Sequence, residues 1–120
     1  MVDAVSRFAM LSSSVHLGGG VAVLPGAVVN AATVLGAGVI VNTNASVDHD
    51  CEIGEFAHIA PGAAIGGGVR VGPRTLVGLG ARILPGLHIG ADVTVGAGAV
   101  VIHDLPDGCT VVGVPARTLH

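Results

Sequence analysis

With 120 residues, the chain has room for one domain. Its formal net charge of -3 and its pI of about 6.0 provide no basic surface, which argues against nucleic acid and anionic membranes as partners. Hydrophobic residues make up 51% of the sequence but aromatic residues only 2%, so rings cannot fill the interior, and the 20 glycines indicate many tight turns between short aliphatic strands.

Residues 1–10 precede a repeat and are expected to form an N-terminal cap or lead-in, because the exposed end of a repeat array needs covering. From Leu11 onward, an aliphatic residue recurs at every sixth position. The residues of this series are Leu11, Leu17, Val23, Val29, Leu35, Val41, Val47, Ile53, Ile59, Ile65, Val71, Val77, Ile83, Ile89, Val95 and Val101. A small or aliphatic residue follows four positions after each, and Gly, Asn, Asp or Pro cluster between them, as corners of the chain require.

A unit of six residues is too short for a strand with a crossover helix. Three units per turn make a triangular coil, so residues 11–106 are predicted to form an all-β fold, a parallel β-helix of about five coils. Residues 21–41 are apolar enough to suggest a membrane span, but Pro25 and Asn30 interrupt them and their aliphatic residues keep the phase of the repeat. Residues 107–120 leave the repeat and are predicted to form a C-terminal strand and tail.

Residues one coil apart stack at the same corner of such a helix, so the sequence predicts columns of neighbours. Gly67 stacks on His49 in one column. Ala97 stacks on Leu79 in another. His49 and His58 are half a coil apart and therefore lie on opposite sides of the prism. They cannot easily share a site within one chain. If prisms pack around a threefold axis as a homotrimer, the His49 corner of one subunit can face the His58 and Leu79 side of the next, and the subunit interface becomes the natural cleft.

Segment 42–52 is the most polar part of the chain, and His49 lies within it between Asp48 and Asp50. A carboxylate that accepts a hydrogen bond from the ring would orient it and raise its basicity, so His49 is the candidate general base, with one of these two flanking carboxylates as its partner. The alternative is a solvated histidine in a turn. Cys51 occupies an inward position of the repeat and is expected to be a buried, inert thiol.

Two more residues belong to the candidate site. Gly67 permits close approach and can offer its backbone N–H to a developing oxyanion, with a plain tight turn as the alternative. His58 is expected to contact a ligand in a groove, and the alternative is a polar residue that lines the groove without touching one.

Several motifs resemble one enzyme family. They are Asn-Thr-Asn at 42–44, the run from His49 through Pro61-Gly62, Gly-Gly-Gly-Val at 66–69, Asp-Leu-Pro at 104–106, and Val-Gly-Val-Pro-Ala-Arg at 112–117. Over nearly the whole chain, the sequence resembles the bacterial sialic acid O-acetyltransferase and UDP-4-amino-sugar N-acetyltransferase family of hexapeptide-repeat transferases. The resemblance implies a left-handed β-helix, whereas the general rule for crossovers would predict a right-handed one.

The resemblance also implies a site. His49 would be the general base and Asp50 would raise its basicity, while His58 and main-chain groups at Leu79 and Ala97 would bind acetyl-CoA as co-substrate, with no metal. The acetyl group would pass directly to an amino or hydroxyl group of a sugar or sugar nucleotide, without an acyl-enzyme. Members of the family usually carry an N-terminal α/β domain of about 70 residues or more that binds the nucleotide part of the sugar substrate. Only ten residues precede the repeat here, so three alternatives stay open: the acceptor differs, another protein binds the nucleotide, or the chain is a truncated piece.

Two other functions compete with this interpretation. A non-catalytic trimeric β-helix could simply present its faces to partners. A γ-class carbonic anhydrase shares the fold and holds zinc, but it needs a His-x4-His pair that this sequence lacks. With two cysteines and no signal-peptide pattern at the start, we expect a cytoplasmic protein with free thiols, and one disulfide is the alternative.

Overall fold

The structure is a computed structural model and describes residues 2–119. Short strands follow one another along the chain, almost all of them two residues long. Their bounds are β1 (Ala4–Val5), β2 (Met10–Leu11), β3 (His16–Leu17), β4 (Ala22–Val23), β5 (Val28–Val29), β6 (Val34–Leu35), β7 (Ile40–Val41), β8 (Ser46–Val47), β9 (Glu52–Ile53), β10 (His58–Ile59), β11 (Ala64–Ile65), β12 (Arg70–Val71), β13 (Leu76–Val77), β14 (Arg82–Ile83), β15 (His88–Ile89), β16 (Thr94–Val95), β17 (Val100–Val101), β18 (Thr110–Val112) and β19 (Arg117–Thr118).

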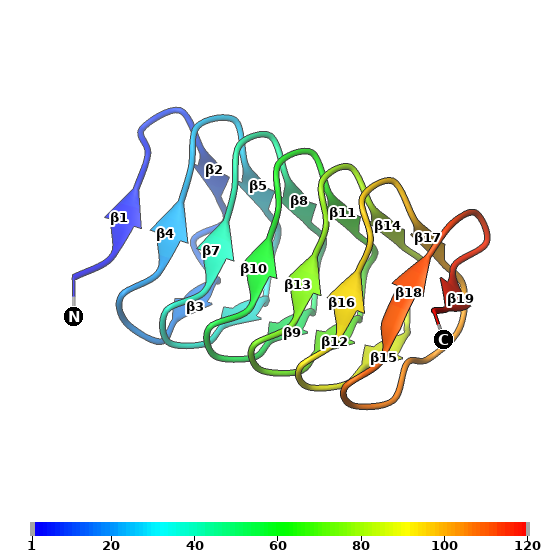
Figure 1. Cartoon of the computed structure of the whole chain (residues 1–120). Helices are drawn as coiled ribbons and strands as arrows, with labels where there is room; N and C mark the ends of the chain where they lie inside the picture. The colour runs from blue at the N-terminus through cyan, green and yellow to red at the C-terminus, as the bar shows by residue number, and fades with distance from the viewer. Residues whose placement is uncertain (1, 120) are drawn as a thin grey trace.

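Every third strand joins the same sheet. Sheet A has the order β1-β4-β7-β10-β13-β16-β18-β19, sheet B runs from β2 to β17, and sheet C runs from β3 to β15. Pairing is parallel between residues 18 apart, as in His58 with Leu76 and Ala64 with Arg82. In Figure 1 the chain rises along the near side and descends along the far side while it advances from the N-terminus, which is a left-handed coil. The predicted left-handed parallel β-helix is confirmed.

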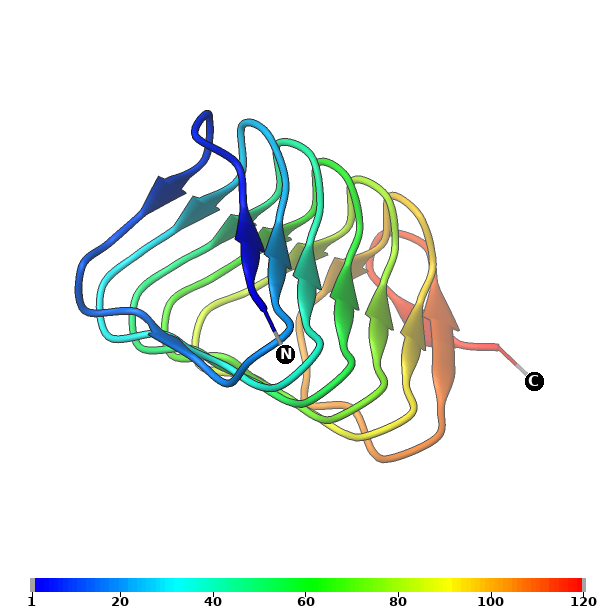
Figure 2. The ribbon, with the colours of Figure 1, turned by 90° about the vertical axis from the view of Figure 1, so that its left-hand side faces the viewer.

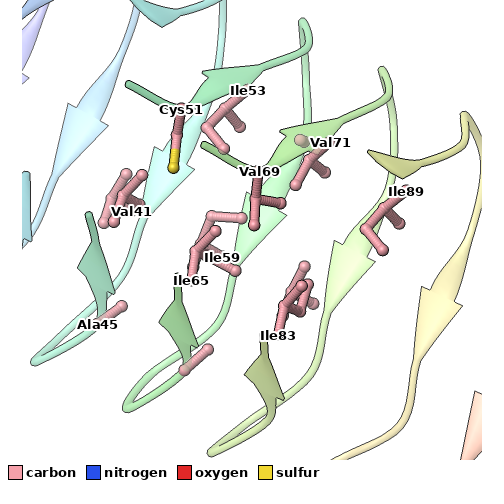
Figure 3. Packing of buried hydrophobic residues seen from close by; sticks show 14 of the residues in the cluster. Val41, Ala45, Cys51, Ile53, Ile59, Ile65, Val69, Val71, Ile83 and Ile89 are labelled. Carbon is pink, nitrogen blue, oxygen red and sulfur yellow. The ribbon is translucent and has the colours of Figure 1, made fainter. Parts of the chain in front are cut away.

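The coils stack into a prism measuring 39 × 21 × 20 Å, seen from its N-terminal side in Figure 2. The six-residue series points into it, and Leu35, Ile53 and Ile59 are buried. Figure 3 shows isoleucines of neighbouring coils directed into the space between the sheets. Each such side chain contributes about 1.5–3 kcal/mol by leaving water. The narrow interior excludes rings, and both Phe8 and Phe56 lie outside it with more than half of their surface exposed.

Part of the segment that precedes Leu11 already belongs to the sheets. β1 pairs in parallel with β4 one coil later. Val5 is in phase with Leu11, so the repeat already includes it. The Asp3 carboxylate accepts the N–H of Val21 at 2.9 Å and thereby satisfies a donor at this end of the prism.

At the C-terminal end the coil is shortened. Leu105 forms a parallel bridge to Ile89, and Thr110 of β18 pairs with Thr94, so residues 16 apart rather than 18 are now neighbours. Asp104 and Asp107 at this corner accept the backbone N–H groups of His88 and Ala91. β19 then turns back and pairs antiparallel with β18, which ends the parallel ladder of sheet A.

The apolar stretch 21–41 forms β4 to β7 of the prism. Among residues 2–119, no helix is long and apolar enough to cross a membrane. Cys51 is buried and Cys109 partly buried, and both are free thiols rather than partners in a disulfide.

Candidate active site

His49 lies at the corner that follows β8, between sheets B and C. Its Nδ1 is 2.9 Å from Asp50 Oδ2. Because a carboxylate only accepts hydrogen bonds, Nδ1 carries the proton, and Nε2 of the neutral ring is left as a proton acceptor. Asp50 adopts a left-handed backbone conformation with φ of 56°, which Asp tolerates better than most residues and which turns its side chain back toward the ring.

Asp48 fixes the other side of this turn. Its Oδ1 accepts the backbone N–H of His49 at 2.8 Å and the amide N–H of Asn30, one coil earlier, at 3.0 Å. These two hydrogen bonds lower the pKa of Asp48, so its carboxylate stays charged. The hydrogen bond to Asp50 raises the pKa of His49, and the charge of Asp48 adds to that effect. The turn therefore holds a basic imidazole between two acidic residues.

Gly67 lies next to the ring of His49, one coil further on. A Cβ atom at residue 67 would come within 2.7 Å of His49 Nε2, closer than side chains approach each other, so only glycine leaves room for the ring in this position. The two turns are also linked by their backbones, because the N–H of Gly68 donates to the carbonyl of His49 at 2.9 Å. The structure thus brings His49, Asp50 and Gly67 together at one corner.

A groove of about 320 Å³ runs along sheet B beside this corner. It is lined by Asn30, Ser46, Asp48, Ala64, Ile65, Gly66, Arg82, Ile83 and Leu84. A larger groove of about 510 Å³ on sheet C contains Glu52, Arg70 and His88 but none of the residues predicted for the site. The sheet B groove does not include His49 or Gly67 either, but it includes Asp48 and Gly66, the residues that precede them, and so borders their corner.

His58 lies on β10 in sheet A, the face opposite the corner of His49. Its Nε2 is 3.1 Å from Asn42 Nδ2. The Oδ1 of Asn42 accepts the N–H of Thr43, so the amide group of Asn42 faces the ring as a donor. His58 Nε2 must then accept, which leaves Nδ1 with the proton and makes His58 a neutral hydrogen-bond donor toward the exterior.

Leu79 and Ala97 lie one above the other at the corner that follows sheet A, and both are exposed. The N–H of Gly98 donates to the carbonyl of Leu79 at 2.8 Å, which joins the two turns. The amide N–H groups of Leu79 and Ala97 themselves have no hydrogen-bond acceptor within residues 2–119. His58, Leu79 and Ala97 therefore form a second group of donors, separated from the His49 corner by the width of the prism.

Three polar partners were not predicted from the sequence. Asn30 is one coil before Asp48, so the column rule that pairs Gly67 with His49 would have found it. Asn42 is 16 residues before His58 and reaches it diagonally, which columns do not predict. Thr33 was treated as a small inward residue of the repeat, yet its polar side chain is fully buried, and a buried hydroxyl needs partners.

No three His, Cys, Asp or Glu side chains within residues 2–119 lie close enough together to hold a metal ion. His58 lies on sheet A, His16 and His88 lie on sheet C, and the acidic residues on either side of His49 are engaged with its ring and its backbone. The donor set that zinc requires is therefore not assembled in this part of the chain.

Comparison with known proteins places this geometry in context. The bacterial transferase hexapeptide model (six repeats) matches residues 32–67. A search of curated protein sequences found no match. The solved structure of PerB from Caulobacter crescentus, in complex with CoA and GDP-perosamine, is 49% identical, with a TM-score of 0.98, and the match covers 100% of this chain and 58% of that one.

Two other solved structures are similar. The acetyltransferase domain of PglB from Neisseria gonorrhoeae FA1090, in complex with acetyl coenzyme A, is 46% identical with a TM-score of 0.97 over 98% of this chain and 57% of that one. WeeI from Acinetobacter baumannii AYE is 34% identical, with a TM-score of 0.91, and the match covers 95% of this chain and 56% of that one. The chain thus spans less than two thirds of the length of these relatives. The repeat match and the structural likeness together identify the chain as a bacterial transferase hexapeptide-repeat protein.

Proposed function

We propose that the chain is an acetyl-CoA-dependent acetyltransferase that transfers the acetyl group directly to an amino group of a sugar or sugar nucleotide, with His49 as general base. The observation that carries the proposal is the hydrogen bond between His49 Nδ1 and Asp50, which leaves Nε2 as a base beside Gly67. The likeness to proteins solved with CoA, acetyl coenzyme A and GDP-perosamine supports it.

The chemistry uses these groups in a definite order. His49 Nε2 removes a proton as the amine nitrogen attacks the thioester carbonyl and forms the new N–C bond. The backbone N–H of Gly67 stabilises the oxyanion of the tetrahedral intermediate. The C–S bond then breaks, and the imidazolium returns its proton to the departing thiolate of CoA. A sugar hydroxyl would react in the same way, so O-acetylation is the second form of the same reaction.

The cofactor site would combine His58, Leu79 and Ala97. The Nδ1–H of His58 and the amide N–H groups of the other two residues are donors that suit the amide carbonyls and phosphate oxygens of acetyl-CoA. His58 lies on the face opposite the His49 corner, and Leu79 and Ala97 lie at the other edge of sheet B, so His58 and His49 of one chain face different sides of the prism. We therefore propose a homotrimer in which the His49 corner of one subunit faces sheet A of the next.

The acceptor is proposed from chemistry and likeness together. Asn30, Ser46 and Asp48 give the groove beside His49 hydrogen-bonding groups and a negative charge, and Arg82 adds a positive charge, a combination that suits an amino sugar linked to a phosphate. GDP-perosamine bound to PerB supports a nucleotide sugar. We also propose a cytoplasmic location, in keeping with the free thiols of Cys51 and Cys109.

Transfer is tested by following release of the CoA thiol and formation of the acetylated product. The acceptors are GDP-perosamine, a UDP-linked 4-amino sugar and free amino sugars. His49→Asn should lower kcat by about 10²–10⁴-fold, because a positioned general base contributes that much. His88→Asn, a histidine on the exposed face of sheet C, is the matched control and should retain full activity. Equal rates for wild type and His49→Asn would refute the mechanism.

Mixing variants tests whether two subunits build the site. Leu79→Pro removes a proposed cofactor-binding N–H, and proline already occupies the equivalent corner position one coil earlier, at Pro61. Each of Leu79→Pro and His49→Asn should be inactive alone. Trimers formed by refolding the two together should regain activity, because some interfaces join an intact His49 to an intact Leu79. Absence of any recovery, with mixed trimers present by mass, would contradict the shared site.

A further inference from the structure

The corners of the prism are closed in two different ways. In the turns 42–45 and 78–81, the N–H of the fourth residue donates directly to the carbonyl of the first, at 3.0 Å in each case. In the turn 48–51, which carries His49, the carbonyl of the first residue and the N–H of the fourth are instead joined through a side chain from the preceding coil. The Thr33 hydroxyl donates to the carbonyl of Asp48 at 2.7 Å and accepts the N–H of Cys51 at 3.2 Å.

On the next coil, a thiol occupies the position of the hydroxyl. The Cys51 thiol donates to the carbonyl of Gly66 at 3.2 Å, with the carbonyl of His49 as a longer second acceptor at 3.7 Å, and Gly66 is the first residue of the turn that carries Gly67. Thr33 and Cys51 are both fully buried. They form a short polar column inside an otherwise apolar core, and this column lies directly behind the two turns of the candidate site.

We infer that Thr33 and Cys51 are positioning residues, which set the shape of the turns that present His49 and Gly67 to the substrates. The inference rests on the proposed function. A direct hydrogen bond draws the ends of a turn to about 3 Å, whereas an inserted hydroxyl holds them through two successive hydrogen bonds and so widens the turn. A displacement of about 1 Å at a reacting group can cost about 10²-fold in rate, so the width of this turn matters for transfer.

Because the side chains of Thr33 and Cys51 are buried, they can form hydrogen bonds only with groups of the protein. A hydroxyl without access to water must find its partners in the protein, and the hydrogen bonds of Thr33 go to Asp48 and Cys51, the residues on either side of His49 and Asp50. Burial also raises the pKa of the Cys51 thiol, which keeps its proton available as a donor to Gly66.

A second buried threonine of the chain provides a control for Thr33. Thr75 is equally buried, and its hydroxyl donates to the carbonyl of Gly90 at 2.7 Å and accepts the N–H of Val93 at 3.1 Å. This is the same bridge, but the turn that it spans carries none of the residues of the candidate site. Thr75 is connected to that site by the backbone hydrogen bond from His58 N–H to the Thr75 carbonyl, which a change of side chain leaves in place.

The experiment compares Thr33→Val, Thr33→Ser and Thr75→Val. Both valine variants should lower the melting temperature by a similar amount, since each removes one buried bridge. Thr33→Val should lower kcat by about 10–100-fold with little change in the KM for acetyl-CoA. Thr33→Ser, which keeps the hydroxyl, should recover most of kcat, and Thr75→Val should retain it. If Thr33→Val does not fold, Cys51→Ala compared with Cys51→Ser tests the second bridge in the same way.

A second readout does not depend on turnover. The ring Cε1–H resonance of His49, followed by NMR over pH, should shift its titration midpoint in Thr33→Val but not in Thr75→Val. Equal kcat and equal midpoints in the two valine variants would overturn the inference, even when His49→Asn is inactive. Wild-type rates in His49→Asn would instead refute the proposed function, and the NMR comparison would then decide the positioning role alone.

Discussion

The imidazole of His49 lies against Gly67 of the next coil, so closely that a Cβ atom there would approach its Nε2 to 2.7 Å and its Cε1 to 2.8 Å. The two residues are 18 apart in sequence and are neighbours only because the coil has that period. The base and the nearest backbone donor are therefore placed by the fold itself, with no loop between them.

Gly67→Ala should separate these two groups. The added methyl must displace the ring, so we expect kcat to fall by about 10²-fold, as for a reacting group moved by about 1 Å. Folding should be nearly unaffected, because alanine occupies the same corner position one coil before His49, at Ala31. Steady-state kinetics and thermal unfolding of the same samples check the prediction. Full activity in Gly67→Ala would contradict the close contact.

The pH dependence of transfer should depend on Asp50. His49 acts as a base only when neutral, and because its pKa is raised, activity should fall at a higher pH than for an ordinary histidine as the solution is acidified. Asp50→Asn removes the carboxylate that stabilises the imidazolium, so the pKa of His49 falls. The midpoint of the profile of kcat/KM against pH should then move to lower pH.

Asp48→Asn provides the comparison. The Asp48 carboxylate raises the pKa of His49 through its charge alone, whereas Asp50 also accepts the hydrogen bond of the ring. Asp48→Asn should therefore move the midpoint of the pH profile less than Asp50→Asn does. The plateau rate at high pH should fall about 10-fold in Asp50→Asn, because a less basic, less well oriented ring accepts the proton. A larger shift in Asp48→Asn would contradict this assignment.

The tautomer of His58 should depend on Asn42. Asn42→Asp replaces a donor with an acceptor at 3.1 Å from Nε2, so the ring proton moves to Nε2 and Nδ1 ceases to be a donor. We expect the KM for acetyl-CoA to rise by about 10-fold, the effect of one lost hydrogen bond that leaves its partner unpaired. Asn44→Asp makes the same change of charge two residues away and should leave KM unchanged. Equal KM values in both variants would be incompatible with this role.

Replacing two adjacent alanines by glycine should change the stability of the protein in opposite directions. Ala32 has a φ of 61°, in the left-handed region that costs a residue with a Cβ about 1–2 kcal/mol. Ala32→Gly should therefore stabilise the protein by about 0.5–1 kcal/mol, after the greater freedom of the unfolded chain is subtracted. Ala31→Gly gains no such relief and should destabilise it by about 0.5–1 kcal/mol. Urea unfolding of the two variants checks the sign.

The fold was predictable because the repeat is nearly perfect. An aliphatic residue at every sixth position, such as Ile59, leaves only one way to bury all of them, and the same period predicts that Gly67 meets His49. Val5 is also in phase with this series, and β1, which contains it, pairs with β4 one coil later. The short C-terminal coil was not predictable from the period, because Leu105 pairs out of phase with it.

The candidate site was predictable only in part. Asp50 is adjacent to His49 in the sequence, so their hydrogen bond needs no tertiary information. The hydrogen bond between Asn42 and His58 depends on rotamers that reach across coils, which no spacing rule provides. The bridge made by Thr33 depends on how a turn is closed, and an inward threonine in a repeat of valines and alanines was its only signal in the sequence.

The pairing of residues 18 apart also restricts how such a chain can change in length during evolution. Removing one residue within a coil would put the strands of that coil out of register with those of its neighbours, and a loss between residues 49 and 67 would part His49 from Gly67. Whole coils can be gained or lost without that damage, and single residues can be lost where the period already breaks, at the corner before Leu105. Insertions and deletions among natural variants should therefore come in multiples of 18 along the prism and in any number beyond it.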